Sequence, residues 1–224
     1  TKGITVLGTG DFTHPVWMRE IKTKLEPAEE GLFRLTSKTV SSMRFMLSVE
    51  ISSIYSKGGK TRRIHNLVYA PSLEAAEKIN RGLASRGNLS SDGRPILGID
   101  SKELLKIVLD ADSRSVLVPA HAWTPWFSIF GSMSGFDSID ECFDDLKEHV
   151  FAIETGLSSD PSMNWRWSHL NTIALISNSD SHSLQKIGRE ANIFDIDLSY
   201  HALWEAVRSR DPKRFLSTIE FFPE

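Results

Sequence analysis

Seven His, Asp and Glu side chains lie in or next to short apolar, β-rich runs of the sequence. They are Asp11, His14, Glu50, His65, His121, Asp180 and His182. Imidazole and carboxylate groups without thiolates suit zinc, manganese, iron or magnesium, and more than four candidate ligands indicate more than one ion. Paired divalent ions hold a phosphoryl group and lower the pKa of a water molecule for attack on phosphorus. The residue types therefore predict a divalent-metal site that hydrolyses phosphoesters.

The local pattern around these residues separates ligand candidates from structural residues. Asp180 and His182 present two ligand types from one loop, directly after a buried run. Glu50 and Glu154 are carboxylates within apolar strands, where an unpaired charge is costly, and a salt bridge to Lys or Arg is the alternative explanation. Three further histidines have no acidic or His partner at ligand spacing, so we interpret them as structural. They are His149, His169 and His201.

Strands whose carboxyl ends meet at one rim would bring the candidate ligands together. Short β-rich runs alternate with segments of helical period, which predicts a mainly parallel sheet or barrel covered by helices. Gly58 and Gly59 supply the positive φ that a hairpin turn needs, so the second and third strands are expected to be antiparallel. The predicted strands are Ile4–Gly8, Arg44–Ser53, Arg63–Ala70, Ser115–Ala120, Phe151–Glu154, Ile173–Ser177 and Thr218–Phe222.

Capping residues predict where the helices begin. Ser72, Ser101 and Ser138 each precede a run with helical spacing, and each is expected to cap a helix of about three turns. A last helix is expected over Tyr200–Ser209, because an Asp-Pro pair follows it as a stop signal.

The composition is that of an ordinary globular domain. The chain has 224 residues, 40% hydrophobic and 25% charged, which excludes a disordered polymer or a collagen-like repeat. Cys142 is the only cysteine, which excludes an internal disulfide and a cysteine-based zinc cage and makes a cytoplasmic location the default. No internal repeat or linker is visible, so we expect one domain over residues 1–224. Because the chain starts and stops on strand-like residues, we expect it to be cut from a longer protein at both ends.

Five segments resemble the polymerase and histidinol phosphatase (PHP) superfamily, and within it the endonuclease Q-like members. They are Gly8–Pro15, Val49–Tyr55, Pro119–Trp126, Glu154–Pro161 and Ser177–His182. The similarity covers essentially the whole chain. It implies a distorted seven-stranded (β/α) barrel with metal ions at its carboxyl rim. It also implies an enzyme that nicks DNA on the 5′ side of deaminated bases, such as uracil and hypoxanthine, or of abasic sites.

The same resemblance assigns the metal ligands by motif. The ligand set it implies is Glu50, His65, His121, Asp180 and His182, with either Asp11 or His14 in the second motif. Asp180, His182 and Glu50 are the expected catalytic residues, whereas the role of Glu154 is left open. The family's first motif, a His-x-His pair, does not occur in this sequence and is expected before Thr1. A cysteine-containing zinc element and a further domain of these relatives are expected beyond Glu224.

A nuclease of this kind needs basic side chains for the DNA backbone and aromatic surface beside an extruded base. Residues 1–70 carry 11 basic and 6 acidic side chains, whereas residues 71–224 carry 15 and 23, so the overall net charge of −3 hides a basic N-terminal part. The expected DNA-binding residues are Lys57, Lys60, Arg62, Arg63, Trp123 and Trp126. The alternatives are a solvated hairpin tip for the basic residues and rings that fill the barrel mouth for the tryptophans.

Two other functions stay open from the sequence. A small-molecule phosphoesterase of the same superfamily would use the same metals on a compact phosphate monoester. A domain without the His-x-His pair could bind its ligand without catalysing a reaction. The aromatic, loop-rich rim and the basic hairpin suit a polymer better, so the first interpretation is a DNA endonuclease whose partner is DNA with damaged bases.

Overall fold

The computed structural model describes residues 2–37, 42–91 and 93–221. Its strands are β1 (Val6–Gly8), β2 (Leu25–Pro27), β3 (Phe33–Leu35), β4 (Arg44–Lys57), β5 (Lys60–Ala70), β6 (Ile96–Leu97), β7 (Val116–Pro119), β8 (Ala152–Glu154), β9 (Ala174–Ile176), β10 (Ala191–Phe194) and β11 (Phe215–Ile219). Its α-helices are α1 (Pro15–Lys24), α2 (Leu73–Leu83), α3 (Ser101–Ala111), α4 (Ile139–Phe143), α5 (Pro161–Asn164) and α6 (Tyr200–Ser209). The 3₁₀ turns are η1 (Asp144–His149), η2 (Ser168–Leu170) and η3 (Leu184–Lys186). None of the helices in the described ranges has the length and apolar character needed to cross a membrane.

A seven-stranded mixed sheet forms the centre of the fold. Its order is β2-β3-β4-β5-β7, and β1 and β6 each pair with β4. Only β1 and β6 run parallel to β4, while the remaining neighbours in this sheet are antiparallel. Two further pairs stand apart, the parallel pair β8–β9 and the antiparallel pair β10–β11.

The mixed α/β class is confirmed, but the expectation of a mainly parallel sheet is wrong. Strands β2 to β5 follow one another through short connections, and neighbours joined in this way must be antiparallel. The expected distorted seven-stranded (β/α) barrel is not confirmed either, because the described strands form one sheet and two separate pairs and do not close into a barrel.

The hairpin β4–β5 is the longest pair of strands. Lys57 pairs directly with Lys60, and the ladder continues to the pair of Leu47 and Ala70. Gly58 and Gly59 have φ of 62° and 72°, and positive φ at both central residues is the geometry that matches the twist of two antiparallel strands. The predicted antiparallel hairpin is therefore confirmed.

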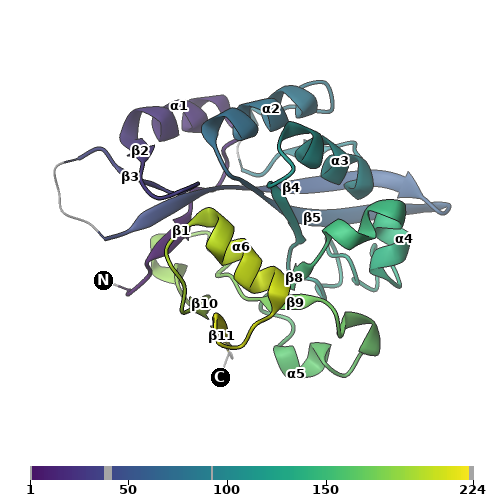
Figure 1. The fold of residues 1–224 in the computed structure, drawn as a ribbon. Coiled ribbons are helices and arrows are strands. Elements are labelled where there is room, and N and C mark those ends of the chain that lie inside the picture. Colours follow the sequence, from purple (N-terminus) through teal and green to yellow (C-terminus); the bar gives the residue numbers. More distant parts are fainter. Residues whose placement is uncertain (1, 38–41, 92, 222–224) are drawn as a thin grey trace.

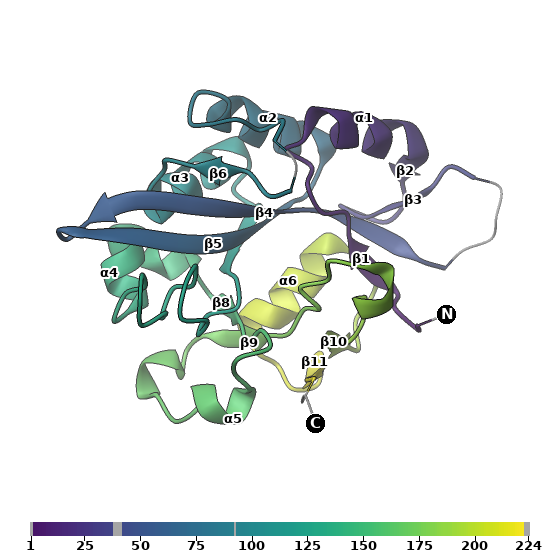
Figure 2. The same cartoon turned by 180° about the vertical axis from the view of Figure 1, so that it is seen from behind.

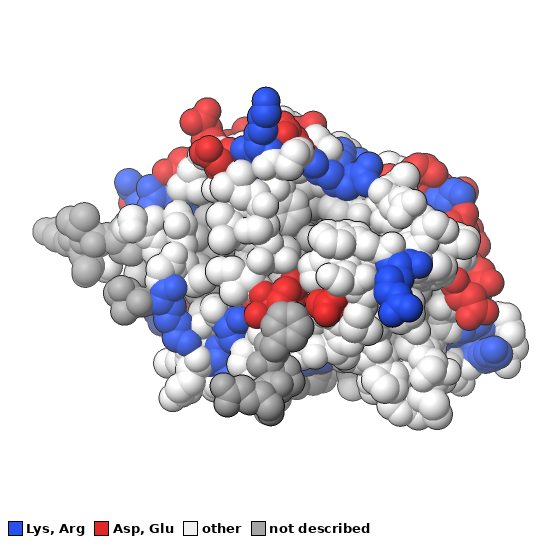
Figure 3. Space-filling view, turned by 90° about the horizontal axis from the view of Figure 1, so that it is seen from below, with Lys and Arg blue, Asp and Glu red and all other residues white. Residues whose placement is uncertain are grey.

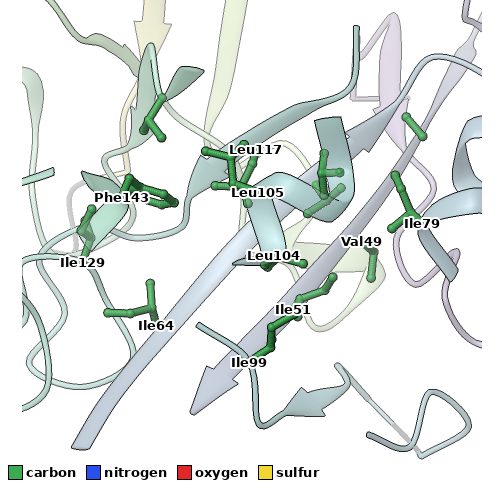
Figure 4. Packing of buried hydrophobic residues seen from close by; sticks show 14 of the residues in the cluster. Val49, Ile51, Ile64, Ile79, Ile99, Leu104, Leu105, Leu117, Ile129 and Phe143 are labelled. Atoms are coloured by element: carbon green, nitrogen blue, oxygen red, sulfur yellow. The ribbon is translucent and has the colours of Figure 1, made fainter. Parts of the chain in front are cut away.

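Strand β4 separates two apolar layers. Val49 and Ile51 belong to the larger core, which the helices α2 and α3 cover (Figure 4). Met46 belongs to a second core on the other side, together with Trp204 of α6. Because side chains alternate along a strand, Glu50 points away from Val49 and Ile51, toward the side of the second core.

The same alternation places His65 on β5. Ile64 and Val68 lie in the larger core, whereas Leu67 and Tyr69 pack against the second one. His65 thus shares the face of Leu67 and Tyr69. Figures 1 and 2 show the layers from both sides, with α1, α2 and α3 above the sheet and α6 with β8 to β11 below it.

The helix starts agree with the capping residues except at one position. Ser72 and Ser138 cap α2 and α4 as expected. Helix α3 is capped by Asp100, and Ser101 is its first residue instead of its cap. Helix α4 ends after five residues instead of three turns, because Asp144 adopts a φ of 49° and the chain continues as the turn η1.

Toward the end of the chain the predictions are partly confirmed. Helix α6 spans Tyr200–Ser209 as predicted. The final strand covers Phe215–Ile219 instead of Thr218–Phe222, and Phe222 lies outside the described residues. Its start follows from pairing with β10, because Phe194 and Phe215 are register partners whose rings stack at 4.8 Å.

Cys142 is packed in the larger core with 0% of its surface exposed. Burial raises the pKa of its thiol to about 12, so the reactive thiolate is absent at neutral pH. We expect a disulfide-exchange reagent at about pH 8 to leave the native protein unmodified and to label it once after unfolding in denaturant. Labelling of the native protein at the rate of a free thiol would contradict this packing.

Candidate metal centre

Three candidate ligands meet on the face of the sheet opposite the larger core. They come from β4 (Glu50), from β5 (His65) and from the residue pair that follows β7 (His121). His65 Nδ1 lies 2.9 Å from Glu50 Oε1 and 3.0 Å from His121 Nε2, and Glu50 Oε1 lies 3.4 Å from His121 Nε2. Ligands that hold zinc at about 2.0–2.1 Å in a tetrahedral arrangement lie about 3.3 Å apart. These three side chains could therefore hold a metal ion.

The sheet register brings these residues together. Ser52 pairs with His65 across the hairpin, so Glu50 lies diagonally opposite His65 on the same face. Ala120 donates a backbone hydrogen bond of 3.0 Å to the His65 carbonyl, which continues the pairing of β7 with β5 and delivers His121 beside His65.

Thr124 fixes the tautomer of His121. Its hydroxyl donates to the Trp126 carbonyl at 2.8 Å and lies 3.0 Å from His121 Nδ1. Since the hydroxyl proton is used by that carbonyl, the hydroxyl oxygen accepts from Nδ1–H. The lone pair of His121 is then on Nε2, the atom that faces Glu50 and His65, as a metal ligand requires.

Burial and charge oppose one another at the three ligands. Burial alone would raise the pKa of Glu50, but the neighbouring rings of His121 and His65 and the charge of Arg94 hold that pKa well below its usual range. Burial lowers the pKa of His65, although the neighbouring carboxylate of Glu50 raises it. For His121 the nearby carboxylates of Glu50, Glu154 and Asp180 outweigh burial and raise the pKa. Glu50 is accordingly an ionised carboxylate, which is the form that binds a cation.

Glu154 supports His121 from behind. It is buried at the end of β8, where it accepts the His121 backbone N–H at 2.8 Å and the Asn178 amide at 2.9 Å. Burial raises the pKa of Glu154 to about 7, although both hydrogen bonds lower it. Its contact is with the backbone of His121 and not with the ring, so its place in the structure is that of a positioning residue.

A cavity of about 1410 Å³ is lined by two of the three ligands, Glu50 and His121. Predicted site residues among its lining are Asp11, Glu50, His121, Asp180 and His182. His182 is 64% exposed and Asp180 30% exposed, and neither joins the cluster of Glu50, His65 and His121. His14 is the N-cap of α1 and does not line this cavity, so Asp11 is the better placed of the two second-motif candidates.

Three of the non-glycine residues with positive φ line this cavity. Asp11 (φ 44°), His121 (φ 30°) and Asp180 (φ 42°) follow β1, β7 and β9 within a few residues. A side chain in this backbone region costs roughly 1–2 kcal/mol, and such positions gather at functional sites. The shared conformation supports a common role for the three loops.

Sequence reasoning missed Arg94, which lies among the candidate ligands. Its guanidinium contacts His65 Nδ1 at 2.7 Å, Glu50 Oε1 at 3.1 Å and His182 Nε2 at 3.1 Å. The available signal was a lone arginine between Gly93 and Pro95 in a polar stretch, which carries no periodic pattern.

Three of the expected DNA-binding residues are engaged within the protein. Lys57 binds the Cys142 carbonyl at 3.0 Å and Asp144 at 3.1 Å. The Arg62 guanidinium lies 4.0 Å from the centre of the Phe136 ring. Trp123 packs against Phe130 and Trp167 and donates to Asn164 at 2.8 Å, which agrees with the alternative of a ring that fills the mouth of the site.

The other three keep some exposed surface, although Arg63 is half-buried. Lys60 is exposed at the hairpin turn, and Trp126 is 44% exposed with the Arg63 guanidinium 5.1 Å from its ring centre. On the face seen from below, Figure 3 shows acidic side chains gathered near the centre and basic ones separated around them. Over its described residues this face is not a continuous basic surface.

No family model matches the chain. It is 30% identical to the uncharacterized protein YqxK of Bacillus subtilis over 99% of its own length and 56% of that protein. It is 29% identical to the uncharacterized protein MJ0043 of Methanocaldococcus jannaschii over 55% of its length and 13% of that protein. The chain thus spans about half the length of YqxK and a smaller part of MJ0043.

Two solved structures share the architecture. The lesion-specific endonuclease PfuEndoQ from Pyrococcus furiosus matches 96% of the chain and 50% of its own with a TM-score of 0.81 and 25% identity. An endonuclease Q complex with a 27-mer duplex that carries an abasic lesion at the active site matches 97% of the chain and 51% of its own, again with a TM-score of 0.81, at 27% identity. The chain is similar to endonuclease Q.

Proposed function

We propose that the chain is the catalytic part of a metal-dependent endonuclease that nicks DNA 5′ of deaminated bases or abasic sites. The observation that carries the proposal is the cluster of Glu50, His65 and His121 beside a large cavity, in a fold similar to that of endonuclease Q. Asp11, Asp180 and His182, which line the same cavity, are proposed as further ligands or catalytic residues.

The donor set fits a divalent ion. The carboxylate of Glu50 is ionised and the Nε2 lone pair of His121 faces it, so the charge and the tautomer are those that a cation needs. When bound, divalent ions lower the pKa of water and neutralise charge that develops on a phosphoryl group. Glu154 and Thr124 hold the backbone and the ring of His121 in position for that role.

A nicking assay tests the proposal. The 224-residue chain and the longest natural protein that contains it are incubated with Mn²⁺ or Mg²⁺ and a duplex carrying one deoxyuridine, one deoxyinosine or one abasic site. We expect a single nick 5′ of the lesion and no cut in the undamaged duplex. Rapid hydrolysis of a phosphomonoester, with all three lesion duplexes left intact, would overturn the proposal in favour of a small-molecule phosphoesterase.

The accessible basic residues of the hairpin give a prediction for DNA binding. Replacing Lys60 and Arg63 by alanine is expected to weaken binding of a lesion duplex and to reduce the salt slope of log K by about 2, because two phosphate contacts are lost. The control carries Lys78→Ala and Lys106→Ala on α2 and α3, which lie above the sheet in Figure 1. Equal salt slopes for the two variants would show that the hairpin tip is only solvated.

A further inference from the structure

Arg94 is held against the candidate ligands by its backbone as well as by its side chain. The carbonyl of Pro95 accepts the Ser52 backbone N–H at 2.9 Å, and β6 then pairs with β4 at Ser52 and Ser53. This anchor fixes Arg94 beside β4, close to Glu50. The side chain is 27% exposed and lines the same cavity as Glu50 and His121.

The contacts of Arg94 are made with the atoms that a metal ion would use. A guanidinium has hydrogen-bond donors only and stays charged at all accessible pH values. His65 Nδ1 and His182 Nε2, at 2.7 Å and 3.1 Å, must therefore offer it lone pairs, and Glu50 Oε1 at 3.1 Å offers it a negative charge. A divalent ion needs the same lone pairs and the same charge.

Arg94 and a divalent ion consequently exclude one another from this place. They compete for Glu50 Oε1 and His65 Nδ1, and two cations a few ångströms apart repel strongly in a partly buried site. A guanidinium that loses these partners keeps its charge at the edge of the cavity. Its planar fork of donors then matches two oxygens of one phosphate group.

We propose that Arg94 competes with a divalent ion for the candidate ligands and binds a phosphate group once the ion holds them. The phosphate is that of the nucleic-acid substrate, so this part of the inference rests on the proposed function. Arg94 thereby couples metal binding to substrate binding, because the guanidinium that the metal ion displaces from Glu50 and His65 is the group that binds the phosphate.

The test uses Arg94→Gln and two probes, Mn²⁺ alone and then dimethyl phosphate with the Mn²⁺-loaded protein. Calorimetry gives the Mn²⁺ affinity, and relaxation of the phosphorus NMR signal reports the diester near Mn²⁺. We expect Arg94→Gln to bind Mn²⁺ about tenfold more tightly than the wild type, because no guanidinium competes for the ligands. We expect it to bind dimethyl phosphate about tenfold more weakly, because charge-assisted hydrogen bonds to the phosphate are lost. A wild-type value in either measurement would overturn the proposal.

Arg86→Gln is the matched control. Arg86 also lies between α2 and β6, but it pairs with the exposed Glu103 at 3.2 Å, so both affinities are expected to stay at the wild-type value. Arg94→Lys keeps the charge but lacks the planar fork of guanidinium donors. It replaces Arg94→Gln in the dimethyl phosphate measurement if Arg94→Gln does not fold. It is expected to bind dimethyl phosphate less tightly than the wild type, and unchanged binding would count against the proposal. Neither measurement involves cleavage of DNA, so a failure of lesion nicking and a failure of this inference are separate results.

Discussion

Glu50→Gln is expected to weaken divalent-ion binding by more than about a hundredfold, and nicking of lesion DNA is expected to fall with it. Loss of an outer-shell partner already costs about 10–100-fold in metal affinity, and Glu50 would be a direct ligand. The glutamine keeps the size of the side chain but removes the only negative charge of the cluster formed with His65 and His121. The affinity is measured by calorimetry with Zn²⁺ or Mn²⁺.

Glu148→Gln is the control for this variant. Glu148 is an exposed carboxylate in the turn η1, so its replacement makes the same change of charge outside the cluster. Its metal affinity and activity are expected to match the wild type. If Glu50→Gln bound the ion as tightly as Glu148→Gln, the cluster would not be the metal centre.

Gly156→Ala is expected to destabilise the protein by about 2–5 kcal/mol and to disturb His121. Gly156 has a φ of 63°, and a Cβ at this position would lie 2.6 Å from His121 Cβ and 2.8 Å from His121 Cα. The left-handed backbone contributes about 1–2 kcal/mol and the overpacking about 1–3 kcal/mol. Because the clash is with a candidate ligand, metal affinity is expected to fall together with the melting temperature.

Gly59→Ala separates the two causes. Gly59 has a φ of 72°, but nothing lies within 4 Å of an added Cβ. Only the backbone term applies, so a loss of about 1–2 kcal/mol with unchanged metal affinity is expected. Denaturant unfolding and a metal titration on both variants provide the measurement. Equal effects of the two substitutions would contradict the contact between Gly156 and His121.

The positions of Glu50, His65 and His121 were predictable because local patterns determine them. Glu50 and His65 lie on apolar strands whose alternation fixes the face of the side chain, and His121 lies just after the apolar strand β7. The paired glycines Gly58 and Gly59 determined the hairpin and hence the approach of the first two ligands. Metal binding by these residues, and the roles of Asp11, Asp180 and His182, stay predictions.

The rest of the fold depends on contacts that no local pattern encodes. The alternation of strands and helices predicted a mainly parallel sheet or barrel, and the family resemblance implied a distorted seven-stranded barrel. The order of strands in a sheet, however, depends on which edges pair. Strand β1 comes before β4 in the chain and β6 comes after it, each well separated from β4, and both pair with β4. The contacts of Arg94 could not be predicted for the same reason, because its partners Glu50, His65 and His182 are distant in the chain.

The β4–β5 turn has a consequence for how the chain tolerates length changes. Exposed loop tips commonly accept insertions, but in a hairpin the turn sets the pairing of both strands. One extra residue between Lys57 and Lys60 that shifted the ladder would turn either Glu50 or His65 toward the larger core, away from the other. A single residue added at this exposed turn would therefore separate two of the candidate ligands.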